Sequence, residues 1–258
     1  MNDPLRGERA WPPFALVLAV VAVSSGVVGW YTADSAAVAL GATVTAAALV
    51  AVGVRAPGAL AAAWREHRPY VGFATGLFAA GAVFGVLLFL AGVDLVDVFL
   101  ELLEEEFGPL EEGEPGDELA LEVTAGFFIA QNTPPFLLSI FGAVTVGVLT
   151  LVIMVINGIL VGNVVVSVGG DVGFAIVIAS IVPHGIFELP ALFVAAGVGF
   201  RLLHRFVQRV TGAREAFVTK SSLYRTGVFV CFAWLVLVLA AFVEAYVTLW
   251  LVDLLFGS

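Results

Sequence analysis

Charged residues are scarce in this chain. They make up 12% of its 258 residues, whereas about a quarter of an ordinary soluble domain is charged. Hydrophobic residues reach 61%, and the mean hydropathy is +1.07. This composition excludes a cytosolic enzyme and a nucleic-acid-binding module, so nucleic acid is not an expected partner. It predicts a multi-pass protein of the cell membrane, surrounded by the lipid bilayer.

Cysteine and lysine are nearly absent. Cys231 is the single cysteine and cannot form an internal disulfide, which excludes a disulfide-stapled secreted domain. Lys220 is the one lysine among 11 basic residues, and the net charge is −10. Such a composition is halophile-like, because a carboxylate-rich surface stays hydrated in concentrated salt, which screens its self-repulsion. A single acidic loop in an ordinary protein is the alternative interpretation.

The usual catalytic signatures are also missing. The chain contains no His-Glu-x-x-His, no Gly-x-Ser-x-Gly, no phosphate-binding Gly-x-x-x-x-Gly-Lys and no cysteine pair with zinc spacing. We therefore expect a protein that is not an enzyme and that has no cofactor and no bound metal.

Apolar stretches long enough to cross a bilayer recur along the chain, which predicts an all-α membrane helix bundle. About six spans are expected, with at least one broken or re-entrant helix: Phe14–Tyr31, Ser35–Val54, Tyr70–Val93, Phe136–Val161, Val172–Phe200 and Gly227–Leu251. A turn is expected at Asn163–Asp171. We interpret residues 1–60 as a two-span N-terminal extension and residues 61–258 as the membrane domain.

The charges set the expected orientation. Bases gather at the N-terminus, in residues 55–68 and in residues 201–225, whereas the stretch Asp94–Glu122 holds twelve acids and no base. The positive-inside rule therefore places the acidic segment 94–118 outside and the basic segment 201–225 inside. This requires an odd number of crossings between the two segments, but the predicted spans supply only two.

Three explanations of this parity stay open. In the first, the apolar piece Leu119–Asn132 is a third crossing. In the second, one segment is re-entrant, and in the third, the charge rule does not hold for this chain. Leu119–Asn132 is short for a hydrocarbon core about 30 Å thick. A re-entrant element at Pro183-His184-Gly185, where we expect the helix to be broken, is therefore the preferred explanation.

His184 and Glu188 are the sharpest candidates for a functional site. On a helix that begins near Pro183 they share one face, and an ionisable pair at membrane depth is by default a functional candidate. A structural pair that locks helices together carries similar weight, and we expect Glu188 to be buried and hydrogen-bonded. The polar site also includes Pro183 and three amide residues, whose alternative role is hydrogen bonding between helices and capping of broken ends: Gln131, Asn132 and Asn157.

Two other polar features concern the last third of the chain. Glu244 interrupts the final span, and burial against protein is its expected environment. Arg201, Arg205 and Arg209 repeat every four residues, which predicts an interfacial helix with its arginines toward lipid phosphates. A simple extension of the preceding span with solvated arginines is the alternative.

The order of several motifs resembles the stage II sporulation protein M family. Gln131-Asn132 comes first and is followed by a helix with Gly142 and Gly147, by Asn157-Gly158-x-x-x-Gly162, and by the specific string Pro183-His184-Gly185-Ile186-Phe187-Glu188-Leu189-Pro190-Ala191. The family usually has two asparagines where this chain has Gln131-Asn132. The resemblance extends from Tyr70 to the C-terminus and implies an integral membrane protein. In spore-forming bacteria such proteins belong to a membrane complex that organises cell-wall hydrolases during engulfment.

Two functions follow as hypotheses. The first is a non-enzymatic organiser or scaffold of a membrane complex, with other membrane proteins or further copies of itself as partners. The alternative is a transporter or channel-like protein with its site around His184 and Glu188, built from discontinuous helices.

Overall fold

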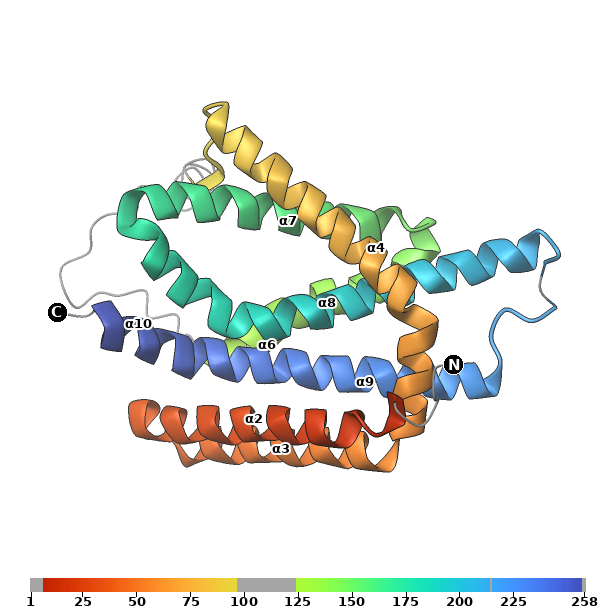
Figure 1. Ribbon diagram of the computed structural model, residues 1–258, viewed down its shortest axis with the longest axis horizontal. Helices are drawn as coiled ribbons and strands as arrows, with labels where there is room; N and C mark the ends of the chain where they lie inside the picture. The colour runs from red at the N-terminus through yellow and green to blue at the C-terminus, as the bar shows by residue number, and fades with distance from the viewer. Residues whose placement is uncertain (1–6, 97–123, 214, 257–258) are drawn as a thin grey trace.

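The computed structural model describes residues 7–96, 124–213 and 215–256 (Figure 1). These residues form helices and contain no strand, which confirms the all-α prediction. Six stretches of them are long and apolar enough to cross a membrane, and one stretch of 63 residues contains both α7 and α8. The helices are α2 (Trp11–Ala33), α3 (Ala36–Arg55), α4 (Pro57–Leu90), α6 (Ala125–Phe141), α7 (Val148–Val168), α8 (Phe174–Val210), α9 (Lys220–Phe242) and α10 (Leu249–Phe256).

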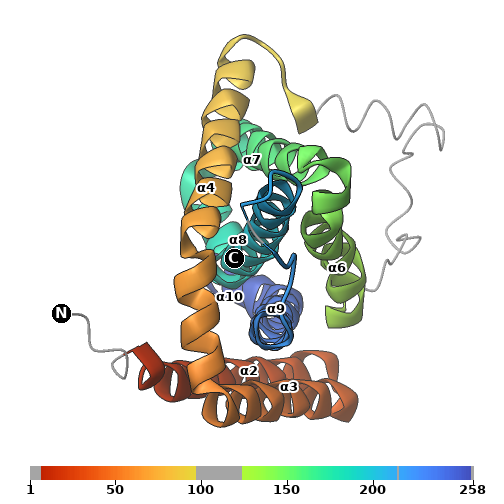
Figure 2. The same ribbon diagram turned by 90° about the vertical axis from the view of Figure 1, so that its right-hand side faces the viewer.

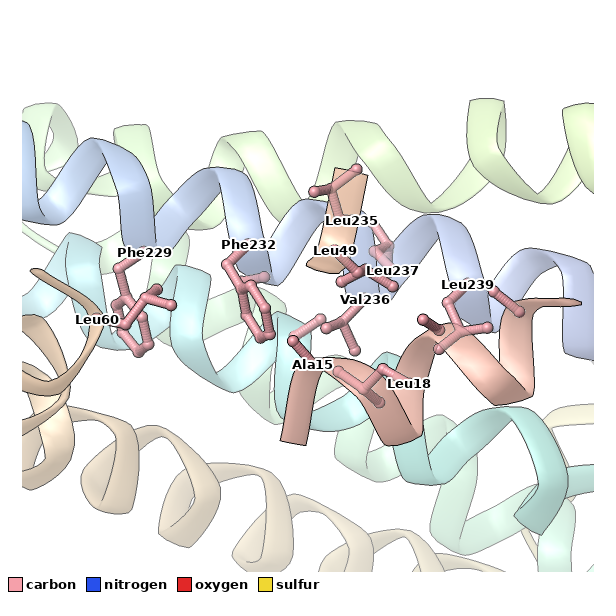
Figure 3. Close-up of a cluster of buried hydrophobic side chains, with 14 of the residues drawn as sticks. Ala15, Leu18, Leu49, Leu60, Phe229, Phe232, Leu235, Val236, Leu237 and Leu239 are labelled. Carbon is pink, nitrogen blue, oxygen red and sulfur yellow. The ribbon is translucent and has the colours of Figure 1, made fainter. Parts of the chain in front are cut away.

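α9 is the central helix of the bundle. In its most apolar stretch 67% of the residues are buried, against 17–39% in the other candidate spans. Its buried face, which includes Phe229 and Leu239, packs in one cluster with Leu18 of α2 and Leu49 of α3 (Figure 3). Helices α2 and α3 form an antiparallel pair along one side of α9 (Figures 1 and 2). The two N-terminal spans predicted from the sequence are therefore present, and they pack on the rest of the protein.

Helices α4 and α7 approach each other through glycine. A Cβ atom at Gly81 or Gly85 of α4 would collide with the backbone of α7, and a Cβ atom at Gly158 or Gly162 of α7 would collide with the backbone of α4. Each glycine pair has the spacing that lets membrane helices come close. The four glycines therefore serve packing and place the backbones of the two helices in direct contact.

The expected span Phe136–Val161 is wrong, because a tight reversal divides it. The chain leaves α6 through a short 3-10 helix, η1 (Gly142–Thr145), and passes through positive φ angles at Val146 (54°) and Gly147 (80°). The amide of Gly147 donates to the carbonyl of Gly142 at 2.8 Å and closes the turn. Thus α6 with η1 and α7 are two antiparallel segments of 21 residues, each about 30 Å long.

The expected turn and break near α8 also lie elsewhere. Residues 163–168 continue α7, and the chain reverses through a π-helical segment, η2 (Gly169–Gly173), where Gly173 has a φ of 95°. The prediction of a broken chain at Pro183-His184-Gly185 is wrong, because α8 runs through it. Pro183 and Pro190 lie inside α8, and the helix changes direction along its length (Figure 1). Prolines bend a helix because each removes a hydrogen-bond donor and crowds the preceding turn.

These corrections resolve the parity of the crossings. Three successive helices, α6, α7 and α8, run in alternating directions between the end of the molecule where α4 ends and the end where α8 ends (Figure 1). Three is the odd number that the charge rule requires, so a re-entrant segment is not needed. Most of the acidic segment, residues 97–118, lies outside the described residues.

Candidate functional site

Two irregular helices bring three ionisable side chains together. His184 and Glu188 lie one turn apart on α8, as their spacing predicted, but Pro183 is inside the helix rather than at its first position. Glu244 comes from η3 (Val243–Thr248), a π-helical segment that joins α9 to α10. Single π-helical turns within α-helices occur frequently at functional sites. The cluster His184–Glu188–Glu244, called the polar cluster below, therefore forms where neither helix is regular.

The distances within the polar cluster are short. Nε2 of His184 lies 3.8 Å from Oε1 of Glu244. One ligand atom from each of the three residues lies within 4.8 Å of the others. Glu188 is half-buried rather than buried, and its neighbours in the cluster are His184 and Glu244.

A cavity of about 530 Å³ reaches this cluster from the side of α10. His184 and Glu244 line it together with Ser180, Thr248 and Asp253. Within the described part of the chain, three buried polar atoms at this place have no hydrogen-bond partner: Nδ1 of His184, Oε2 of Glu244 and Oγ1 of Thr248. Buried polar atoms are nearly always paired, so these unpaired atoms mark a place built for a ligand or for water.

The other predicted polar residues do not join the cluster. Gln131 is exposed on α6, and Asn132 is half-buried there. The side-chain amide of Asn157 donates to the carbonyl of Ile153 at 2.8 Å, so this hydrogen bond lies within α7 and joins no second helix.

Asn163, at the start of the expected turn, makes three hydrogen bonds that join α7 to α4 and the segment after it. It is completely buried on α7. Its Nδ2 donates to the carbonyls of Gly85 (3.2 Å) and Val93 (2.9 Å), and its Oδ1 accepts from the amide of Leu95 (2.8 Å). The side chain thus ties the end of α4 and the turn after it to α7.

The predicted interfacial helix is wrong, since residues 201–210 continue α8. Arg201 and Arg205 are buried, with 7% and 8% of their surface exposed, so they do not face lipid; Arg209 is exposed. Burial follows from a partner on α4, because Glu66 pairs with Arg201 and also lies 3.8 Å from Arg205. A buried cation needs such a partner.

The same glutamate joins three helices. Arg225 of α9 binds Glu66 at 2.6 Å, and Arg205 donates to Ser222 of α9 at 2.5 Å. His67 lies 3.3 Å from Arg201 through Nε2, while its Nδ1 bonds the carbonyl of Ala63 at 2.7 Å. This ion-pair network closes the end of the bundle where the basic segments meet, and it lies at the opposite end from α10 (Figure 1).

Comparison with known proteins places this fold in a family. The model of "Stage II sporulation protein M" matches residues 73–249, more than half of the chain, and this range holds the whole polar cluster. An uncharacterized protein from Methanocaldococcus jannaschii is 26% identical over 121 residues, which are 46% of this chain and 68% of that protein. No solved structure matches. The chain therefore belongs to the stage II sporulation protein M family of integral membrane proteins.

Proposed function

We propose that this protein is a non-enzymatic transporter or channel-like protein of the cell membrane, and that the polar cluster binds the cation it moves. The observation that carries the proposal is the convergence of His184, Glu188 and Glu244 beside a cavity, within helices long and apolar enough to cross a bilayer. Ionisable side chains inside membrane segments are costly and mark ion or substrate pathways.

The charge of the polar cluster favours a cation. Two carboxyl groups and one imidazole lie within 4.8 Å of one another. Two ionised carboxylates so close together in a poorly solvated place repel each other, and a cation between them removes the repulsion. The cluster also lies between a proline-bent helix and a π-helical segment, and transporters commonly build their ion sites from interrupted helices.

A scaffold that organises a membrane complex is the second candidate. Membership of the stage II sporulation protein M family favours it. The outer helices also favour it, because only 17–39% of the residues in their most apolar stretches are buried inside the protein, which leaves large apolar faces exposed. These faces are available to lipid, to other membrane proteins or to further copies of the chain. A scaffold needs no flux, and this distinguishes the two candidates.

Flux measurements on proteoliposomes test the proposal. The full chain is reconstituted, and uptake of protons, Na⁺, K⁺, Mg²⁺, Mn²⁺ and Zn²⁺ is followed separately. We expect uptake of at least one of these cations, with a loss of about tenfold or more in Glu188→Gln and Glu244→Gln, since each variant removes one charge from the pathway. Glu215→Gln is the matched control, because Glu215 is exposed in the loop before α9. Absence of flux for every cation, or equal flux in all variants, would overturn the proposal and favour the scaffold.

A further inference from the structure

We infer that the polar cluster is a binding site for a divalent first-row transition metal ion such as Zn²⁺ or Mn²⁺. The inference names the ligand class of the site on which the proposed function rests. The sequence offered two ligands, His184 and Glu188, which do not make a metal site. The fold adds Glu244 as a third, 56 positions beyond Glu188 (244 − 188).

The geometry needs only small side-chain adjustments. Ligand atoms about 2.1 Å from a tetrahedral metal lie about 3.4 Å from one another. Nε2 of His184 and Oε1 of Glu244 are 3.8 Å apart, and the three ligand atoms lie within 4.8 Å of one another. Rotation about the terminal side-chain torsion of each glutamate, whose allowed range of angles is broad, can bring the carboxylate oxygens closer to the shared metal position. The helix backbones need not move.

The donor set selects the class of metal. Two carboxylates neutralise the charge of a divalent ion, which is what a site poor in water requires. An imidazole ligand suits zinc, iron, copper and nickel, and carboxylates suit Mn²⁺ as well, whereas Mg²⁺ and Ca²⁺ prefer oxygen ligands throughout. The polar cluster therefore favours a transition metal over the alkaline-earth ions and over Na⁺ or K⁺.

An independent observation points to a missing ligand at the same place. Thr248, one turn beyond Glu244, is 5% exposed and lines the cavity, yet its Oγ1 has no partner among the described residues. Oε2 of Glu244 is also buried and unpaired there. A metal-bound water in the cavity would supply hydrogen bonds to both oxygens. Three protein ligands with a fourth position open to a cavity are typical of sites that exchange their fourth ligand, in contrast to closed structural sites.

Direct binding to the purified full chain in detergent tests the inference. Zn²⁺ and Mn²⁺ are titrated in competition with a chromophoric chelator, and bound metal is counted by mass spectrometry. We expect about one tightly bound ion per chain. Each of the variants His184→Gln, Glu188→Gln and Glu244→Gln should weaken binding by at least about tenfold, since loss of a supporting residue alone costs about 10–100-fold.

Matched controls isolate the polar cluster. His204→Gln and Glu215→Gln change the same residue types at exposed positions and should bind as the wild type does. The acidic stretch between Asp94 and Glu122 is common to all variants, so cations that it holds cancel in the comparison. An excess of Mg²⁺ should not displace Zn²⁺. Unchanged elution and circular dichroism show that each variant folds.

The outcomes separate this inference from the proposed function. Site-dependent metal binding without flux of any cation would support the metal site and overturn transport. Flux of another cation that needs Glu188, without site-dependent metal binding, would overturn the metal site and support transport. Equal affinity in the wild type and in the three cluster variants would overturn the metal site outright.

Discussion

Replacement of Asn163 by leucine should cost about 2 kcal/mol of stability. The side chain is completely buried and makes three hydrogen bonds across the interface of α4 and α7, to Gly85, Val93 and Leu95. Hydrogen bonds between membrane helices contribute about 0.6 kcal/mol each on average and about 1.7 kcal/mol at most. Three such bonds give about 2 kcal/mol, or about a 30-fold change in the ratio of folded to unfolded protein. Leucine shares the branching and the number of heavy atoms of asparagine but is larger, so any overpacking at this buried position adds to the loss from the hydrogen bonds.

Asn157→Leu is the matched control for this prediction. It makes the same change on the same helix, but the amide of Asn157 bonds only Ile153 of its own helix among the described residues. The loss there should stay below about 1 kcal/mol. The free energy of unfolding, measured by titration of the micellar protein with a denaturing detergent, gives both values. Equal losses in the two variants, or a loss below about 0.5 kcal/mol for Asn163→Leu, would refute the assigned role of the three bonds.

Two further predictions concern packing and orientation. Gly158→Leu should destabilise the protein by about 3 kcal/mol or more, because a side chain there meets the backbone of α4. Gly76→Leu, on an open face of α4, is the control and should be nearly neutral. Thermal unfolding compares the two variants, and similar losses of stability would contradict the glycine contact. In a protein that carries Cys231→Ser, an impermeant thiol reagent should label Val93→Cys from outside and Ala213→Cys from inside, because three crossings separate these positions. Labelling of both cysteines from the same side of the membrane would contradict this topology.

The hydrophobic spans were predictable where a polar boundary follows them. Asp34 separates α2 from α3, and Arg55 ends α3, so both expected spans agree with the helices. The chain reversal after α6 was not predictable in the same way. Positive φ angles at Val146 and Gly147 and a backbone hydrogen bond make this turn. It contains no charged residue, so the hydropathy of the sequence does not mark it. Pro134 and Pro135, just after the expected apolar piece Leu119–Asn132, lie inside α6 and do not mark a boundary. Membrane helices tolerate prolines when neighbours satisfy the freed backbone groups.

The polar cluster was predictable only in part. The spacing of His184 and Glu188 places them on one helix face, and this information is local. The approach of Glu244 depends on how α8 packs against η3, which no local pattern contains. A single acidic residue in an apolar span, here Glu244, is itself a signal of function, and this was the one indication in the sequence that Glu244 could belong to a site. In the same way, the four-residue spacing of Arg201 and Arg205 gave the shared face correctly but not its burial, because Glu66 lies on another helix.

The two polar sites differ in the residues that form them. At one end, the ion-pair network brings Glu66 together with Arg201, Arg205 and Arg225. At the other end, the cavity of the polar cluster is lined by Glu244 and by Asp253 of α10. Cations are drawn toward clefts lined with negative charge and repelled by positive ones. A cation bound at the polar cluster should therefore enter from the α10 end, the side that the acidic segment is expected to face.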